Sequence, residues 1–289
     1  MSLFSVVRGY NILVIVLAQY LASIYIFAPE RRVYQVLFDP YLFLIVLASA
    51  LSIASGYIIN NFYDAEKDLI NRPHKTMLDS YVSQKTKLTT YFILNFLAVI
   101  LASAVSFRAV AFFSVYIFFL WFYSHKLKKI PLLGNITAAL LAIIPFFGIF
   151  IYYKNFDLVI FVHATFLFLI LFIRELVKDL ENLKGDFAQN YRTLPVVYGN
   201  RITKLAITIA FLLTLVPTYF LLFKKMDVGY MYYYFILSFS LLFVFLILIW
   251  QSKSQLHYRL LHLLLRLILV LGVFSILLID LEMLVNRIL

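Results

Sequence analysis

Long apolar segments recur along the whole sequence and restrict the folds that this chain can adopt. A helix needs roughly 20 apolar residues to cross the hydrocarbon core of a bilayer, and nine segments come close to that length or exceed it. They cover residues 9–28, 41–62, 87–106, 108–124, 132–153, 157–181, 203–223, 229–250 and 263–285. Only 13% of the residues are charged, against about 25% in soluble domains. The segments are continuous rather than alternating, which argues against a β-barrel.

We therefore predict an all-α fold, a polytopic membrane bundle of nine transmembrane helices. Because the apolar segments extend over the whole length, residues 1–289 are predicted to form a single domain. The short gap "SFRA" after the third segment predicts a tight hairpin between the third and fourth helices. The first charged residue, Arg8, follows several apolar residues and no cleavage pattern comes after it. The first segment is therefore interpreted as a retained span rather than a signal peptide.

The charges are distributed unevenly between the two sides of the predicted bundle. Most of the 25 Lys and Arg residues fall at the N-terminus and in the loops on the same side, and the positive-inside rule places that side in the cytoplasm. The net charge of +11 also suits an anionic substrate. The basic residues are scattered between apolar segments, so we expect no nucleic-acid partner. The absence of cysteine excludes disulfides, thiolate metal sites and cysteine nucleophiles.

Two acidic stripes stand at the predicted cytoplasmic ends of the second and sixth segments. Side chains four residues apart share a face of a helix. The first stripe has the spacing i, i+4, i+8 and consists of Asn60, Asp64 and Asp68. The second has the spacing i, i+4, i+7, i+11 and consists of Glu175, Asp179, Asn182 and Asp186. Arg174 and Lys178 flank the second stripe, and the recurrence four segments apart resembles a weak internal repeat.

The chemistry of the stripes points to a hard cation. Two facing rows of carboxylates repel each other unless cations lie between them, and oxygen ligands without sulfur suit Mg²⁺. Bound Mg²⁺ commonly shares its coordination with substrate phosphates. The pattern therefore predicts an anionic diphosphate bridged by metal to both stripes, with nearby basic residues balancing its charge. The simpler interpretation is a solvated loop at a membrane boundary, which explains one stripe better than two.

Four stretches resemble the UbiA superfamily of intramembrane prenyltransferases. The first, "NNFYDAEKDLINRP" from Asn60, is similar to the family's first aspartate-rich signature, except that Asn61 replaces an Asp. The second, "RELVKDLENLKGD" followed by "RTLPVVYG", looks like the digeranylgeranylglyceryl phosphate synthase branch, with Asn182 where Asp is common. The third, "YSHKLKKIPLLGN" from Tyr123, resembles a basic loop of the family, and Arg8 with Asn11 matches an R-x-x-N pattern.

This resemblance implies a helical bundle around a central cavity and a Mg²⁺-dependent transfer reaction. The donor would be an isoprenoid diphosphate such as geranylgeranyl diphosphate, and the acceptor a lipophilic molecule within the membrane lipid. The implied catalytic residues are Asp64, Asp68, Asp179 and Lys128. The implied metal ligands are Asn60, Asp64, Asp68, Glu175, Asp179, Asn182 and Asp186. The implied substrate contacts are Arg8, Asn11, Arg72, Lys75, Tyr123, Lys128, Arg174 and Lys178.

The second motif favours geranylgeranylglyceryl phosphate as the acceptor, in ether lipid synthesis. An aromatic acceptor, as in menaquinone or ubiquinone synthesis, is the alternative within the same family. A membrane transporter is the alternative from another class, since intramembrane charges often mark ion pathways. A member without activity is a further possibility, for which Asn61 and Asn182 are the only indications.

Overall fold

The computed structural model describes residues 5–224 and 228–280, apart from the side chain of Lys75. The described part is helical throughout and contains no strand. Its principal α-helices are α2 (Gly9–Ala22), α3 (Val33–Leu37), α4 (Pro40–Asn71), α5 (Pro73–Ser80), α6 (Gln84–Val105), α7 (Phe107–His125), α8 (Leu133–Tyr153), α9 (Leu158–Ala188), α10 (Leu194–Phe223), α11 (Tyr232–Gln251) and α12 (Gln255–Ser275). Shorter π- or 3₁₀-helical turns are η1 (Ser23–Phe27), η2 (Leu127–Lys129), η3 (Gly229–Met231) and η4 (Ile276–Leu278).

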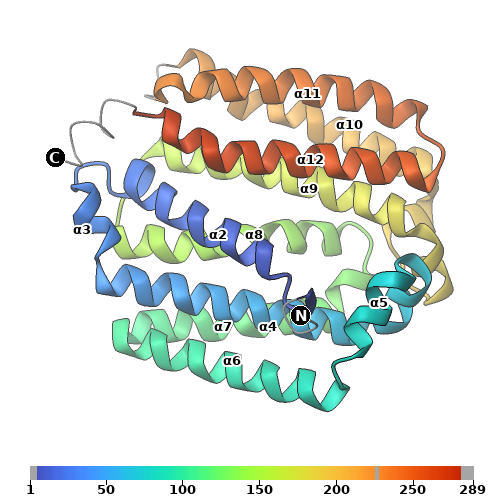
Figure 1. The fold of residues 1–289 in the computed structure, drawn as a ribbon. Coiled ribbons are helices and arrows are strands. Elements are labelled where there is room, and N and C mark those ends of the chain that lie inside the picture. The colour runs from blue at the N-terminus through green and yellow to red at the C-terminus, as the bar shows by residue number, and fades with distance from the viewer. Residues whose placement is uncertain (1–4, 225–227, 281–289) are drawn as a thin grey trace.

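Nine of these helices, some extended by an adjoining turn, are long and apolar enough to cross a membrane within the described ranges. They lie roughly parallel or antiparallel to one another and form one bundle (Figure 1). Each corresponds to one of the nine predicted segments, so the predicted number of spans is confirmed. That residues 1–289 form a single domain stays a prediction.

The two helices that carry the acidic stripes are the longest of the bundle. Helix α4 has 32 residues and α9 has 31, so each extends about 47 Å at 1.5 Å per residue, beyond a hydrocarbon core of about 30 Å. The motif of α4 was expected beyond a span ending near residue 62, but the helix continues to Asn71. Its polar residues recur every four positions, as they do along one face of a helix, so the helix continues past the apolar segment.

The start of α4 is fixed by its own sequence. Asp39 accepts hydrogen bonds from the backbone amides of Tyr41 and Leu42 at 3.0 and 3.2 Å, and Pro40 occupies the first helical turn. A carboxylate cap and a proline at this position both favour a helix start. The predicted hairpin is also confirmed. Only Ser106 separates α6 from α7, and its hydroxyl accepts a hydrogen bond from the amide of Ala109 at 3.1 Å.

Other boundaries differ from the expected ranges. Helix α12 begins at Gln255, eight residues before the predicted segment 263–285, and residues 281–289 lie outside the described part. Helix α10 begins at Leu194 rather than near residue 203, with a break at Gly199, whose φ of 81° favours glycine. The first turns of α10 and α12 carry polar residues, so hydropathy alone did not include them in the predicted spans. The C-terminal ends of α4 and α9 lie at the same end of the bundle, beside α5 (Figure 1).

Candidate active site

A polar cavity of about 1330 Å³ opens where these two long helices meet. It is enclosed by residues of α2, α4, α7, α8, α9 and α12 and of the segments that join them. Every residue of the predicted site lines this cavity except Asn11 and Lys75. Asn11 lies on an exposed face of α2. Lys75 belongs to α5, and its side chain lies outside what the structure describes.

Asp64 is the centre of the first stripe. Its side chain is buried, and its Oδ1 accepts hydrogen bonds from Lys128 Nζ at 2.8 Å and from the Tyr191 hydroxyl at 3.0 Å. Lys128 Nζ also donates to Asn60 Oδ1 at 3.2 Å. Burial, followed by the charge of Asp64, raises the pKa of Tyr191, so its phenol stays protonated and remains a donor. Lys128 and Tyr191 thus bring the loops after α7 and α9 onto α4.

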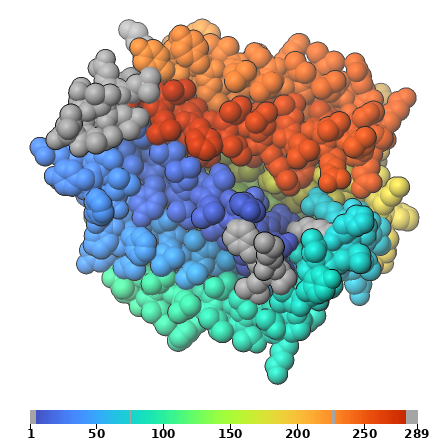
Figure 2. Space-filling model, in the orientation of Figure 1, coloured from blue at the N-terminus to red at the C-terminus, as the bar shows by residue number. Residues whose placement is uncertain are grey.

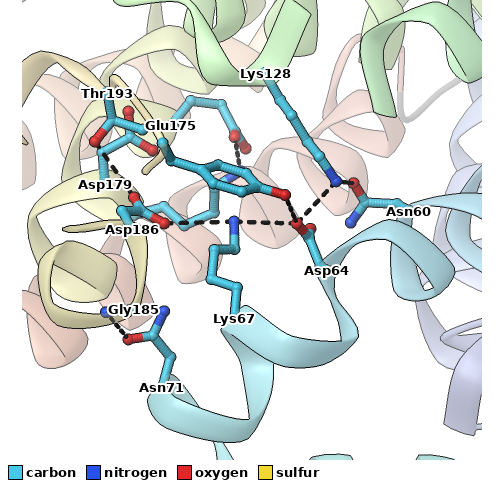
Figure 3. Close-up of polar contacts among 12 residues, drawn as sticks. Asn60, Asp64, Lys67, Asn71, Lys128, Glu175, Asp179, Gly185, Asp186 and Thr193 are labelled. Carbon is cyan, nitrogen blue, oxygen red and sulfur yellow. Dashed lines mark hydrogen bonds and ion pairs between the residues drawn. The ribbon is translucent and has the colours of Figure 1, made fainter. Parts of the chain in front are cut away.

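Lys67 connects the two acidic stripes. Its Nζ lies 3.3 Å from Asp64 Oδ1 and 3.4 Å from Asp186 Oδ1, and it also stands over the Tyr191 ring at 4.4 Å from the centroid. Figure 3 shows the lysine between the two carboxylates. Without a cation there, two buried carboxylates of neighbouring helices would face each other. Lys67 was not predicted as a site residue from the sequence, although its position three residues after Asp64 on a helix placed it beside the stripe.

The second stripe is held by a different set of partners. Asp179 Oδ2 accepts a hydrogen bond from Asn135 Nδ2 at 2.7 Å. Glu175 is paired with Lys178, and its Oε1 lies 3.6 Å from Arg174. Asp186 is 1% exposed, and among the described residues its Oδ1 has no hydrogen-bond donor beyond its ion pair with Lys67. Asn135 lies at the start of α8, in the basic loop motif, and sequence spacing gave no sign that it faces α9.

A close approach of the two helices positions both stripes. The backbone amide of Gly185 donates to Asn71 Oδ1 at 3.0 Å (Figure 3). A Cβ at position 185 would lie 2.4 Å from Asn71 Nδ2, closer than any real contact. A side chain at position 185 would displace Asn71, so glycine permits this contact, and the asparagine of the "NRP" stretch serves as a contact between α4 and α9 rather than as a ligand.

The donor set fits Mg²⁺. All candidate ligands are carboxylate or amide oxygens, which hard cations prefer, and Asp186 offers a buried oxygen without a hydrogen-bond donor. Among the described residues, no three acidic or imidazole side chains already converge as a metal cage. Lys67 instead lies between Asp64 and Asp186. Such an arrangement suits an ion that keeps several waters and shares its coordination with a phosphate.

Four arginines also line the cavity. Arg8, Arg72, Arg174 and Arg266 all line it, together with His262. Glu181 accounts for part of this charge, because its Oε1 lies 3.4 Å from Arg72 and its Oε2 lies 2.6 Å from His262 Nδ1. Arg266, His262 and Glu181 were not predicted from the sequence, since nothing in the sequence places α12 against α9.

Asn61, the departure from the family's first signature, points away from this cavity. Its Nδ2 donates to Asp79 Oδ2 at 2.9 Å, in a separate small pocket beside α5. Asp79 also accepts a hydrogen bond from Ser5 at 3.2 Å. The missing charge at position 61 is thus explained by a structural contact. An amide can donate to Asp79, whereas a second carboxylate would repel it.

The fold and the cavity together define a class: a polytopic α-helical membrane protein with an acidic, cation-balanced site at one end of its bundle. The profile of the UbiA prenyltransferase family matches residues 13–268, and the chain belongs to that family. This establishes an integral membrane protein.

Curated relatives include two named digeranylgeranylglyceryl phosphate synthase. The one from Thermococcus gammatolerans is 33% identical over 164 residues, 55% of this chain and 58% of that protein. The one from Pyrococcus furiosus is 32% identical over 178 residues, 61% of this chain and 64% of that protein. The matched region therefore spans less than two thirds of either relative.

Solved structures share the fold across nearly the whole chain. One, from work on digeranylgeranylglyceryl phosphate synthase in membranes, has a TM-score of 0.71 at 19% identity and covers 95% of this chain and 96% of its own. Another is a UbiA homologue from Archaeoglobus fulgidus bound to DMAPP and Mg²⁺, with a TM-score of 0.67 at 14% identity and coverage of 96% and 99%. At these identities the likeness confirms the predicted all-α bundle.

Replacing Asn61 by Asp is expected to destabilise the protein, even though it restores the family's usual residue. The new carboxylate would lie against buried Asp79, and losing the hydrogen bond at a buried carboxylate costs about 1–3 kcal/mol. The thermal midpoint in detergent should fall, while the Mg²⁺ concentration needed for activity stays the same. A gain in Mg²⁺ affinity would show that residue 61 faces the metal after all.

Replacing Lys67 by Met is expected to destabilise the metal-free protein. Removing one member of a buried charge pair costs about 3–5 kcal/mol, because Asp64 and Asp186 then face each other unbalanced. Added Mg²⁺ should raise the melting temperature of this variant more than that of the original protein. Lys184→Met, at an exposed position on α9, is the control and should change neither value.

Proposed function

We propose that this protein is a Mg²⁺-dependent intramembrane prenyltransferase. The observation that carries the proposal is the cavity itself, which is lined by two acidic helix stripes, by Lys128 and by four arginines. It transfers a prenyl group from an isoprenoid diphosphate to a lipophilic acceptor, and geranylgeranylglyceryl phosphate is the acceptor we favour. The named relatives and the homologue bound to DMAPP and Mg²⁺ support this choice.

The proposed metal ligands are the oxygens of the two stripes. Asp64, Asp68 and Asn60 supply one side, and Glu175, Asp179, Asn182 and Asp186 supply the other. When bound, Mg²⁺ would neutralise the diphosphate and make it a better leaving group. Lys67 lies where it can exchange its carboxylate contacts for contacts with a phosphate oxygen. Lys128 is held by Asp64 and Asn60 with its ammonium at the cavity wall.

The chain's own residues support the reaction by binding and by excluding water. The allylic C–O bond of the donor breaks, the diphosphate leaves with the electron pair, and the acceptor hydroxyl forms the new C–O bond and loses its proton. Lys128, Lys178 and Arg174 stabilise the leaving charge. Tyr123, Tyr57 and Tyr116 line the cavity between its polar walls. Their rings can face a developing allylic cation and keep water away from it.

An apolar cavity of about 890 Å³ extends the site along the same helices. Ile15 of α2 lines the polar cavity, and Ala18 lines the apolar one. On α12, Arg266 lines the first and Leu269 the second. The two spaces therefore follow each other at one helical turn, as a substrate with a charged head and a long hydrocarbon tail requires. A transporter fits less well, because transport sites commonly lie near the bilayer midplane.

We also propose that the acidic end of the bundle and the N-terminus face the cytoplasm. The excess of Lys and Arg on that side supports this orientation. The diphosphate head would then enter from water, while the isoprenoid chain lies within the bundle.

Replacing Asp64 by Asn, or Asp179 by Asn, is expected to lower Mg²⁺-dependent transfer by about 100-fold, because several kcal/mol of leaving-group stabilisation are lost. The assay uses radiolabelled geranylgeranyl diphosphate with geranylgeranylglyceryl phosphate in nanodiscs, and an aromatic quinone precursor in parallel. Glu66→Gln, exposed on α4 and outside the cavity, is the control. Near-normal transfer by either folded Asp variant would contradict the metal assignment.

Filling the apolar cavity should shorten the accepted prenyl chain. Ala164 lines this cavity, and Ala164→Phe is expected to reduce transfer from the C20 donor several-fold more than transfer from the C10 donor. Leu213→Phe, on an exposed face of α10, adds similar bulk outside the cavity and is expected to preserve the original ratio. An equal loss with both donors would place the prenyl chain elsewhere.

A further inference from the structure

Arg266 is a charged residue in the middle of a membrane-spanning helix. It lies 11 residues after the start of α12 at Gln255, so about 16 Å along the helix at 1.5 Å per residue. Helix α12 is long and apolar enough to cross a membrane, and an ionised residue on such a helix commonly marks a functional site. Its side chain lines the polar cavity, one turn beyond His262.

The charges around Arg266 are mostly of its own sign. Arg174, Arg8 and Arg72 line the same cavity as Arg266. In Figure 2, atoms of α9 are visible in a hollow between α12 and the start of α2. The four arginines line one cavity, to which α2, α4, α9 and α12 all contribute.

The nearby carboxylates are already engaged. Glu181 is held by His262 at 2.6 Å and by Arg72 at 3.4 Å. Glu175 is paired with Lys178 and Arg174. Among the described residues, Arg8 and Arg266 form no ion pair. The Arg8 guanidinium stands over the ring of Tyr57, 5.1 Å from its centroid, in a cation–π contact. Two unpaired guanidinium groups beside further arginines favour a bound anion.

The position of these groups selects the kind of anion. Lys67, Lys128, Lys178 and Arg174 are assigned to the donor's diphosphate, so Arg8 and Arg266 are left for a second anion within the same cavity. The apolar cavity starts one turn further along α12, at Leu269 and Gly272. A ligand with a phosphate at Arg266 can therefore extend its hydrocarbon chain along α12, beside the donor's prenyl chain. A phosphate monoester carries close to two negative charges near pH 7, which matches the two unpaired arginines.

We propose that Arg266, together with Arg8, binds the phosphate of the lipid acceptor and makes the enzyme selective for acceptors with a phosphate monoester. This proposal rests on the proposed prenyl transfer and names the acceptor-recognition residues within it. Arg266 acts as a positioning and specificity residue. It holds the acceptor so that its free hydroxyl faces the donor's allylic carbon, and it takes no part in bond making.

The test is a two-by-two comparison of protein and acceptor. Arg266→Gln is expected to raise the KM for geranylgeranylglyceryl phosphate by about 10- to 100-fold, the worth of charged hydrogen bonds, with the KM for the donor unchanged. With the dephosphorylated acceptor, geranylgeranylglycerol, the original protein and the variant should be equally poor. This non-additivity identifies a direct interaction between Arg266 and the phosphate. Equal losses with both acceptors would overturn the proposal.

Two further variants separate charge from geometry and folding. Arg266→Lys keeps the positive charge but loses the planar guanidinium, so its KM for the acceptor should lie between that of the original protein and that of Arg266→Gln. Arg259→Gln is the matched control, since Arg259 lies two turns earlier on α12, is exposed and does not line the cavity. It should behave like the original protein. A KM raised to the same extent in the Arg259 variant would indicate a general effect of charge on α12 and contradict the assignment.

A binding measurement distinguishes failure of this proposal from failure of the proposed function. Geranylgeranylglyceryl phosphate, without donor or Mg²⁺, should raise the melting temperature of the original protein in phosphatidylcholine nanodiscs but not that of Arg266→Gln. If geranylgeranylglyceryl phosphate stabilises the original protein but no prenyl transfer is detected, the proposed anion site stands and the proposed reaction is contradicted. Stabilisation by added phosphatidic acid to the same extent would show a general headgroup anchor and overturn acceptor selectivity.

Discussion

The structure of this protein depends on screening the buried carboxylates of two neighbouring helices from each other's negative charge. Asp64 and Asp186 are both almost inaccessible to solvent and lie on either side of a single lysine ammonium. In a low-dielectric interior such groups repel strongly unless cations separate them. Lys67 meets this need within the chain, and Mg²⁺ with a diphosphate would meet it during the proposed reaction. The site is thus built to exchange one set of cations for another.

This requirement explains the long helices and the contacts between them. The stripes must face each other from rigid supports, so α4 and α9 continue beyond the apolar part of their sequences. The contact between Asn71 and the amide of Gly185 sets their separation. Residues outside the helices complete the site, with Tyr191 and Lys128 reaching Asp64 from two different loops. Each of these contacts fixes a carboxylate that would otherwise be free to turn away.

Local sequence patterns predicted much of this arrangement, and long-range contacts account for the remainder. Hydropathy identified all nine spans because the bilayer imposes a minimum apolar length. Helical spacing identified the two stripes, since residues four apart share a face whatever the tertiary structure. Lys67 and Asn135 were missed because their roles depend on which helix lies opposite. At Asn61 the family resemblance indicated a missing Asp in the first signature. The hydrogen bond from Asn61 to Asp79 gives this residue a structural role instead, which the sequence could not show.

The distribution of charge within the cavity also bears on how one site can receive two lipid anions. If both bound to the same cations, donor and acceptor would compete. Here Arg8 and Arg266 line the same cavity as the carboxylates and their lysines, yet form no ion pair with those carboxylates among the described residues. The carboxylates require metal to attract a diphosphate, whereas the two arginines are cationic without it. A phosphate monoester can therefore bind independently of the metal-bound donor, with both hydrocarbon chains leaving toward apolar surroundings. Separate cationic groups for the two anions would allow donor and acceptor to be bound together in the proposed reaction.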